Sequence, residues 1–156
     1  MKDLSLKPPR IGEEIYLPGF KFLIIPGRWE VDKGEGKWGD LSFSFQGEGR
    51  LNPFSYRIKV FFKEISLEDF SSLSPDLTIP PPLQELRGGL SLLLEGKEKS
   101  LPRTSIMYDL LKGEWKNIRL NLKWNRDEIS VEDFTVEFRK GNLKGKGKVR
   151  WIIPNP

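Results

Sequence analysis

The sequence predicts an all-β fold, a curled antiparallel meander of about eight to ten strands with one short helix. Three observations carry this prediction. Apolar and polar residues alternate in several segments, 18 of the 156 residues are aromatic, and alanine, the strongest helix former, is absent beside 15 glycines and 12 prolines. The length suits a single domain, residues 1–156.

The first predicted strands occupy the N-terminal half. Residues 29–31 and 41–45 alternate, with the glycine-containing stretch 33–36 between them and a second one, 46–49, after them. Residues 54–62 then form one of the longest alternating strands, which ends near Ile65.

The middle of the chain contains the predicted helix. Residues 66–70, with an acidic first turn, resemble a helix start, and Ser74-Pro75 and Pro80-Pro81-Pro82 limit the helix to one or two turns. Leucines at every second position over 90–94 predict another strand. Residues 100–111 remain open between a strand, a short helix and an irregular crossover.

Alternation is clearest near the C-terminus. Residues 118–124 predict a strand with one solvent-facing side, and a turn at 125–127 leads to a returning strand over 129–138. The apolar phase of the returning strand slips by one residue between Val131 and Phe134, which indicates a bulge near Glu132 and Asp133.

A row of basic residues marks the last predicted strand, 143–151, which follows a turn at 140–142. The row consists of Lys144, Lys146, Lys148 and Arg150. It can protect a sheet edge from aggregation, or contact an anionic membrane or lipid head groups. Nucleic acid is a less favoured partner, because Val149 and Trp151 fall on the opposite face and are not placed to stack on bases.

The two halves of the chain share a weak internal echo. Lys33-Gly34-Glu35-Gly36 and Lys112-Gly113-Glu114 each precede alternating strands, about eighty residues apart. The halves run from about 13 to 65 and from about 87 to 153, and both duplication and chance fit the pattern.

Enzymatic chemistry is not expected, and neither a cofactor nor a metal site is predicted. The chain has no histidine or cysteine, which excludes zinc sites, cysteine nucleophiles and histidine-dependent triads. The acidic pairs are adjacent in sequence, so on a strand their carboxylates point to opposite faces. The glycine-rich stretches lack the following helix that a phosphate loop needs, and fit strand twist or close packing better.

Charge and hydropathy say little about location. The net charge is +4, a mild basic excess that fits a solubilising surface. No signal peptide and no run of eighteen apolar residues occurs in the sequence. The proline-rich stretches Lys7-Pro8-Pro9 and Pro154-Asn155-Pro156 near its ends suit a segment of a larger exported or anchored protein, and we expect the chain to be one.

Two stretches resemble the AsmA/TamB-like proteins and the related N component of bacterial type II secretion. Residues 86–96, LRGGLSLLLEG, are similar to the strand that opens a module of that superfamily. Residues 129–136, ISVEDFTV, and 141–149, GNLKGKGKV, resemble its closing strands. The resemblance covers about residues 27 to 153.

The resemblance implies a long, curved antiparallel sheet that forms an apolar, taco-like groove on the periplasmic side of the inner membrane. It implies a non-enzymatic role in accommodating phospholipid or moving it between membranes, as part of a longer anchored protein. The rival hypothesis is a scaffold in a secretion or envelope assembly, which binds neighbouring proteins through its strand edges.

The residues support an apolar face independently, because one side of each predicted strand must be covered by another layer, a partner or a lipid. Phase within the strands assigns ten residues to it: Phe43, Phe45, Tyr56, Ile58, Val60, Leu120, Leu122, Trp124, Val136 and Phe138. Their large volume favours a sealed core with at most a narrow cleft over an open trough, and the fold stays open between a taco-like groove and a flattened sandwich.

Overall fold

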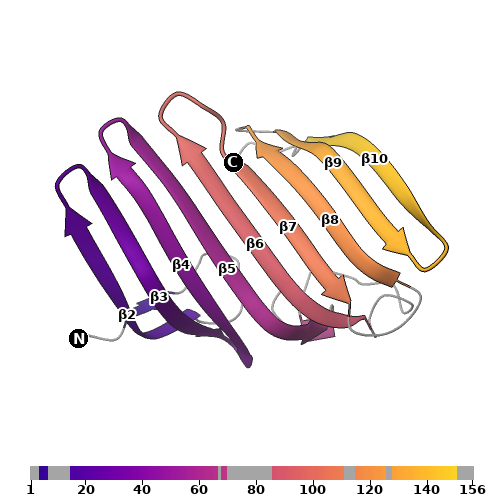
Figure 1. Ribbon diagram of the computed structural model, residues 1–156, viewed down its shortest axis with the longest axis horizontal. Coiled ribbons are helices and arrows are strands. Elements are labelled where there is room, and N and C mark those ends of the chain that lie inside the picture. Colours follow the sequence, from indigo (N-terminus) through magenta and orange to yellow (C-terminus); the bar gives the residue numbers. More distant parts are fainter. Residues whose placement is uncertain are drawn as a thin grey trace, which may run out of the picture.

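The computed structural model describes residues 4–6, 15–66, 68–69, 86–110, 115–125 and 128–150. These residues form one antiparallel sheet whose strands follow each other in sequence order, a meander that is not closed (Figure 1). The strands are β1 (Leu4–Leu6), β2 (Ile15–Ile25), β3 (Arg28–Trp38), β4 (Leu41–Leu51), β5 (Phe54–Ser66), β6 (Arg87–Lys97), β7 (Arg103–Leu110), β8 (Trp115–Trp124), β9 (Glu128–Phe138) and β10 (Gly141–Arg150). The all-β meander is therefore confirmed.

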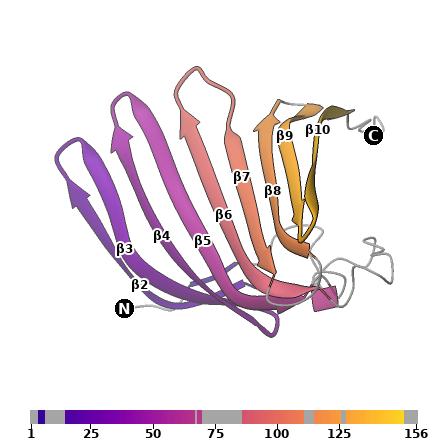
Figure 2. The same ribbon diagram turned by 45° about the vertical axis from the view of Figure 1, so that its right-hand side comes forward.

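The sheet is a single curved layer. Its strands bend toward their lower ends in Figure 2, most clearly in β3 to β6. Pairing of β5 with β6 joins the strands of the two predicted halves into one sheet. A flattened sandwich is thus wrong for the described residues, because their strands form one layer and not two.

The strand registers give the sheet two chemically different faces. Directly opposite residues of antiparallel strands point to the same side. Ile58 of β5, for example, is opposite Gly47 of β4 and Leu94 of β6, so all three lie on one face. The same step, repeated from strand to strand, assigns each paired position of β2 to β10 to one of two faces. On one of them, which we call the apolar face, no paired position holds Asp, Glu, Lys or Arg; the other is the polar face.

Glycines on the apolar face make room for rings on the neighbouring strand. Gly34 and Gly36 of β3 lie opposite Phe45 and Phe43 of β4, and a Cβ atom at either glycine would overlap the facing ring. Residues 33–36 therefore lie within β3, and their glycines serve close packing. Residues 46–49 likewise lie within β4, where Gly47 and Gly49 lie beneath the Trp29 ring.

The best-buried part of the apolar face lies where β5, β6 and β7 meet. Phe62, Ile65, Leu90 and Tyr108 are buried there and form one cluster. The Tyr108 hydroxyl lies 2.7 Å from the carbonyl oxygen of Ile65 and 2.6 Å from that of Leu86, and donates its one proton to this pair. Tyr108 thus ties the end of β5 to the start of β6.

One register feature matches the sequence, whereas two strands had no prediction. The predicted bulge is confirmed, because Asp133 pairs with Asn121 while Val131 pairs with Leu122, which leaves Glu132 as the extra residue. The strands β1 and β2 had no individual prediction. In the open segment 100–111 the strand alternative holds, because Arg103–Leu110 form β7.

The predicted helix after Ile65 is not seen as an element of the described chain. Ser66 and Asp69 form reciprocal bonds, with Ser66 N donating to Asp69 Oδ2 over 2.7 Å and Asp69 N to Ser66 Oγ over 3.3 Å. This capping arrangement closes a single turn, in which Glu68 and Asp69 have helical geometry. Residue 67 and residues 70–85, where the helix was expected to continue, lie outside the described residues.

Candidate functional site

The ten residues predicted for the apolar surface all lie on the apolar face. Cross-strand pairs link them within each half of the sheet: Phe45 is opposite Val60, and Val136 is opposite Ile118, whose strand also carries Leu120, Leu122 and Trp124. Central strands β6 and β7 connect the halves on the same face through Leu92 and Ile106. The register brings the predicted set together, whereas its contact with lipid stays a prediction.

Exposure varies along the apolar face. Val136 is only 2% exposed, and Phe62 and Ile65 are equally well buried. Large side chains at the margins of the face are open instead: Ile24 (66% exposed) and Leu143 (55%) on β2 and β10, and Leu51 (49%) and Phe54 (50%) beside the β4–β5 turn. The face therefore has a sealed interior and open ends.

The polar face is held by side-chain pairs across the strands. Arg57 on β5 and Glu95 on β6 are opposite each other, with 3.1 Å between Nε and Oε1. Asn117 Nδ2 donates to Glu137 Oε2 over 2.7 Å. The half-exposed Arg57–Glu95 pair contributes at most about 1 kcal/mol, so it favours the register more than it adds to stability.

The hollows described in this structure open on the polar face. One of about 930 Å³ crosses the middle of the sheet, and another of about 1070 Å³ lies over the strand ends near the β2–β3, β4–β5 and β6–β7 turns. Sequence reasoning missed these hollows. The available signal was Phe61, which falls in the polar phase of β5, together with Leu93 and Met107 at polar-face positions.

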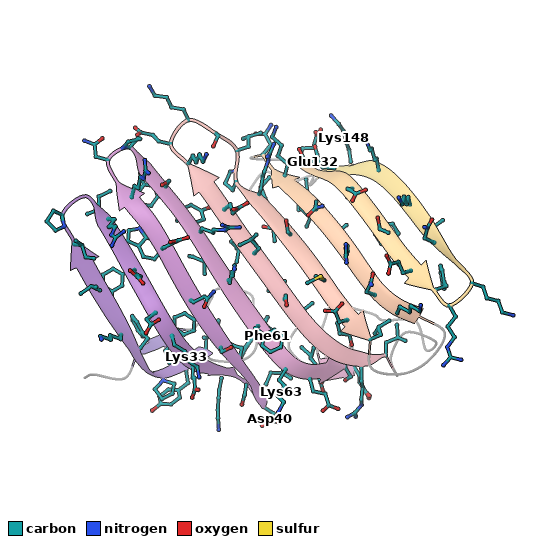
Figure 3. The ribbon with its side chains drawn as sticks, in the orientation of Figure 1. Lys33, Asp40, Phe61, Lys63, Glu132 and Lys148 are labelled. Carbon is teal, nitrogen blue, oxygen red and sulfur yellow. The ribbon has the colours of Figure 1, made fainter. Side chains whose placement is uncertain are left out.

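The predicted basic row is largely exposed. Lys144, Lys146 and Lys148 are exposed, and Lys148 Nζ lies 3.1 Å from Glu128 Oε1. Arg150 belongs to β10 by its backbone, but its side chain lies outside the described residues. Figure 3 shows Lys148 at the upper end of the sheet, near Glu132 of β9. Contact of this row with an anionic surface stays a prediction.

The phenol of Tyr108 has a raised pKa. Burial, with a further contribution from the Asp69 carboxylate, raises the pKa of the Tyr108 phenol from 10.0 to about 12. Its hydroxyl faces backbone carbonyls and no hollow, so the shift fits a structural role.

The described residues contain neither a metal-binding cluster nor a membrane-spanning helix. That part of the chain contains no group of three or more acidic side chains placed to hold a metal ion. None of its helical segments has the length and hydropathy needed to cross a bilayer.

Comparison with protein-family models, with curated proteins and with solved structures finds no match for this chain.

Proposed function

We propose that the protein is a non-enzymatic domain of a bacterial envelope protein that accommodates phospholipid acyl chains on its apolar face. The observation that carries the proposal is the unbroken apolar face, which crosses β2 to β10 without a charged residue at any paired position. An apolar surface of this extent on a single-layer sheet has to be covered, and acyl chains suit it because they impose no directional contacts.

The exposure gradient fits partial coverage by lipid. Acyl chains would lie on the open ends of the face, where Ile24, Phe22 and Leu143 are at least half exposed. The sealed interior around Ile65 and Val136 keeps the sheet folded without a ligand. The proposal therefore needs no closed cavity, and acyl chains would exchange by sliding along the strands.

A matched pair of variants tests this proposal. Ile24 and Leu23 are adjacent, exposed residues of β2 that point to opposite faces, so Ile24→Lys and Leu23→Lys add the same charge on different sides. Each protein is incubated with phosphatidylethanolamine and phosphatidylglycerol vesicles, separated by gel filtration, and examined by native mass spectrometry. We expect phospholipid adducts on wild type and Leu23→Lys and a loss of adducts on Ile24→Lys; equal adducts on all three would contradict the proposal.

A scaffold function is the second candidate, and a feature of β2 supports it. β1 pairs only with Ile15–Leu17, so among the described residues Pro18–Ile25 has a partner on the β3 side alone. Phe22, Leu23 and Ile24 are exposed on both faces of this edge, and a long apolar edge invites another strand. Light scattering discriminates the scaffold function from the lipid-accommodating one. Edge pairing predicts that the protein associates with rising concentration in the absence of lipid, and that Ile24→Lys and Leu23→Lys both weaken this association.

A further inference from the structure

The polar face contains an apolar island that the proposed function does not use. Phe61 of β5, Leu93 of β6 and Met107 of β7 are the apolar side chains at paired polar-face positions between β4 and β9. They are neighbours, because Ser91 of β6 lies opposite both Phe61 and Met107, and Leu93 lies two residues further along β6. Phe61 is 45% and Met107 37% exposed, so these side chains face solvent.

A hollow exists over this island because small residues alternate with large ones. Ser44 and Ser91 flank Phe61 on either side, and Ser105 lies opposite Leu93. The short serine side chains leave space between the longer side chains of Phe61, Leu93 and Met107, and their hydroxyl groups face this space. The resulting hollow of about 930 Å³ is lined from β3 to β8 and includes Phe61 and Lys33, which Figure 3 labels. Its size is within the range of small-molecule sites.

The rim of the hollow is cationic. Lys33, Lys59 and Arg119 line it with Asp32 as the one acidic residue. Lys33 pairs with Glu35 over 3.7 Å, whereas neither Lys59 nor Arg119 has an ion-pair partner among the described residues. Arg119 stands directly between Met107 and Thr135, so its guanidinium borders the island with no carboxylate opposite it.

We propose that this polar-face hollow binds a single-chain amphiphile with an anionic head group, whose chain lies on Phe61, Leu93 and Met107 and whose head group meets Arg119. The island supplies apolar area, and a guanidinium recognises a carboxylate or a phosphate through paired N–H donors. A peptide strand is disfavoured, because β5 to β7 are interior strands with both edges already paired. A stacked nucleic acid is disfavoured, because the island has one ring, Phe61.

The hollow lies on the opposite face from the proposed phospholipid surface. Its occupancy can be followed separately through the NMR signal of the Met107 methyl group. The chain has two methionines, Met1 and Met107, so methyl-labelled methionine gives one resonance inside the hollow. Dodecanoate and dodecyl phosphate, below their micelle concentrations, distinguish a carboxylate from a phosphate head group, and dodecyltrimethylammonium offers the same chain with the opposite charge. We expect saturable shifts of the Met107 methyl with one or both anions and at least about tenfold weaker binding of the cation.

Variants separate the two parts of the site. Phe61→Ser should weaken binding of the anionic amphiphile about tenfold. Arg119→Gln should weaken it about two- to fivefold, because the side chain is exposed. Lys37→Gln, at an exposed position of the same face but outside the hollow, is the matched control and should leave binding unchanged. If Phe61→Ser fails to fold, Arg119→Gln at an exposed position carries the test.

Three results would overturn the proposal: equal affinity for anionic and cationic amphiphiles, no effect of Phe61→Ser or of Arg119→Gln, or binding of a thymidine oligonucleotide in place of either anion. The adducts measured with Ile24→Lys and Leu23→Lys are a separate readout. Phe61→Ser should leave those adducts unchanged, so failure of this site and failure of the apolar-face proposal are distinguishable.

Discussion

Single residues of the apolar face differ in how much the fold depends on them. Val136 is paired with Ile118 and Leu143 and is almost fully buried, while Ile24 is mostly open. Sequence alternation predicts their common face and cannot predict this difference, because exposure depends on the curvature of the sheet and on strands distant in sequence.

A charge placed at these two positions should therefore have unequal effects. Val136→Lys buries an unpaired ammonium, and we expect it to lower the free energy of unfolding by more than about 3 kcal/mol. Ile24→Lys should change it by less than about 0.5 kcal/mol. Urea unfolding of both variants checks this, and a mild Val136→Lys would show that the interior of the face is open rather than sealed.

Tyr108 should make stability depend on pH in the alkaline range. Its raised pKa, about 12 against 10.0, means that the unfolded chain loses the phenol proton first. The contribution of Tyr108 to stability is complete below pH 10 and declines as the pH rises toward 12. We expect Tyr108→Phe to cost about 1 kcal/mol at neutral pH through the lost hydrogen bond. The gap between wild type and variant should shrink between pH 10 and 12, whereas a constant gap would refute the assignment.

Glycine positions give a third residue-level test. A Cβ at Gly88 would overlap the backbone carbonyl of Asp109 on β7, which cannot move aside, whereas Gly147 on β10 has no atom near such a Cβ. Gly88→Ala should lower the free energy of unfolding by at least about 1 kcal/mol. Gly147→Ala should stay within about 0.5 kcal/mol of wild type in the same thermal or urea unfolding.

At the scale of elements, alternation predicts strands well where the two faces differ sharply. The strands β5, β8, β9 and β10 follow their predicted ranges closely. The strand β2 was missed because Pro18-Gly19 interrupts it and because its residues 22–25 are apolar on both faces. In β7, Met107 on the polar face and Thr104 on the apolar face blur the contrast. The glycines of β3 and β4 could be read from the sequence only as sites of twist or close packing, because the rings that face them, such as Phe43 and Trp29, lie on other strands.

The basic row of β10 is a test at the same scale. Each basic residue near an anionic surface contributes about 1 kcal/mol, so reversing Lys144, Lys146, Lys148 and Arg150 to Glu should reduce binding to phosphatidylglycerol vesicles more than tenfold. Co-sedimentation at low and high salt measures this, with reversal of Lys21, Lys37, Lys97 and Lys116 as the control of equal charge. Equal losses in both variants would mean that the row protects the edge and has no specific membrane contact.

At the scale of the whole molecule, the sheet separates a continuous apolar surface from a polar one without a second layer among the described residues. Membership of the groove-forming envelope proteins that the sequence resembles remains a prediction. The functional proposal therefore depends on the chemistry of the apolar face. Sequence phase was sufficient to predict that chemistry, since period-two alternation assigns residues to faces before the order of strands is known. The polar-face hollow needed the strand registers, because Phe61, Leu93 and Met107 come from three strands.

The most direct test of the open apolar face uses Leu143 and Lys144, adjacent exposed residues of β10 that point to the apolar and the polar face. The chain contains no cysteine, so Leu143→Cys and Lys144→Cys each provide one labelling site for a bimane fluorophore. Phosphatidylcholine vesicles containing a spin-labelled lipid are then added. We expect a blue shift and quenching for the label at 143 and little change at 144. Equal quenching at both positions, or none at 143, would contradict a lipid-facing apolar surface.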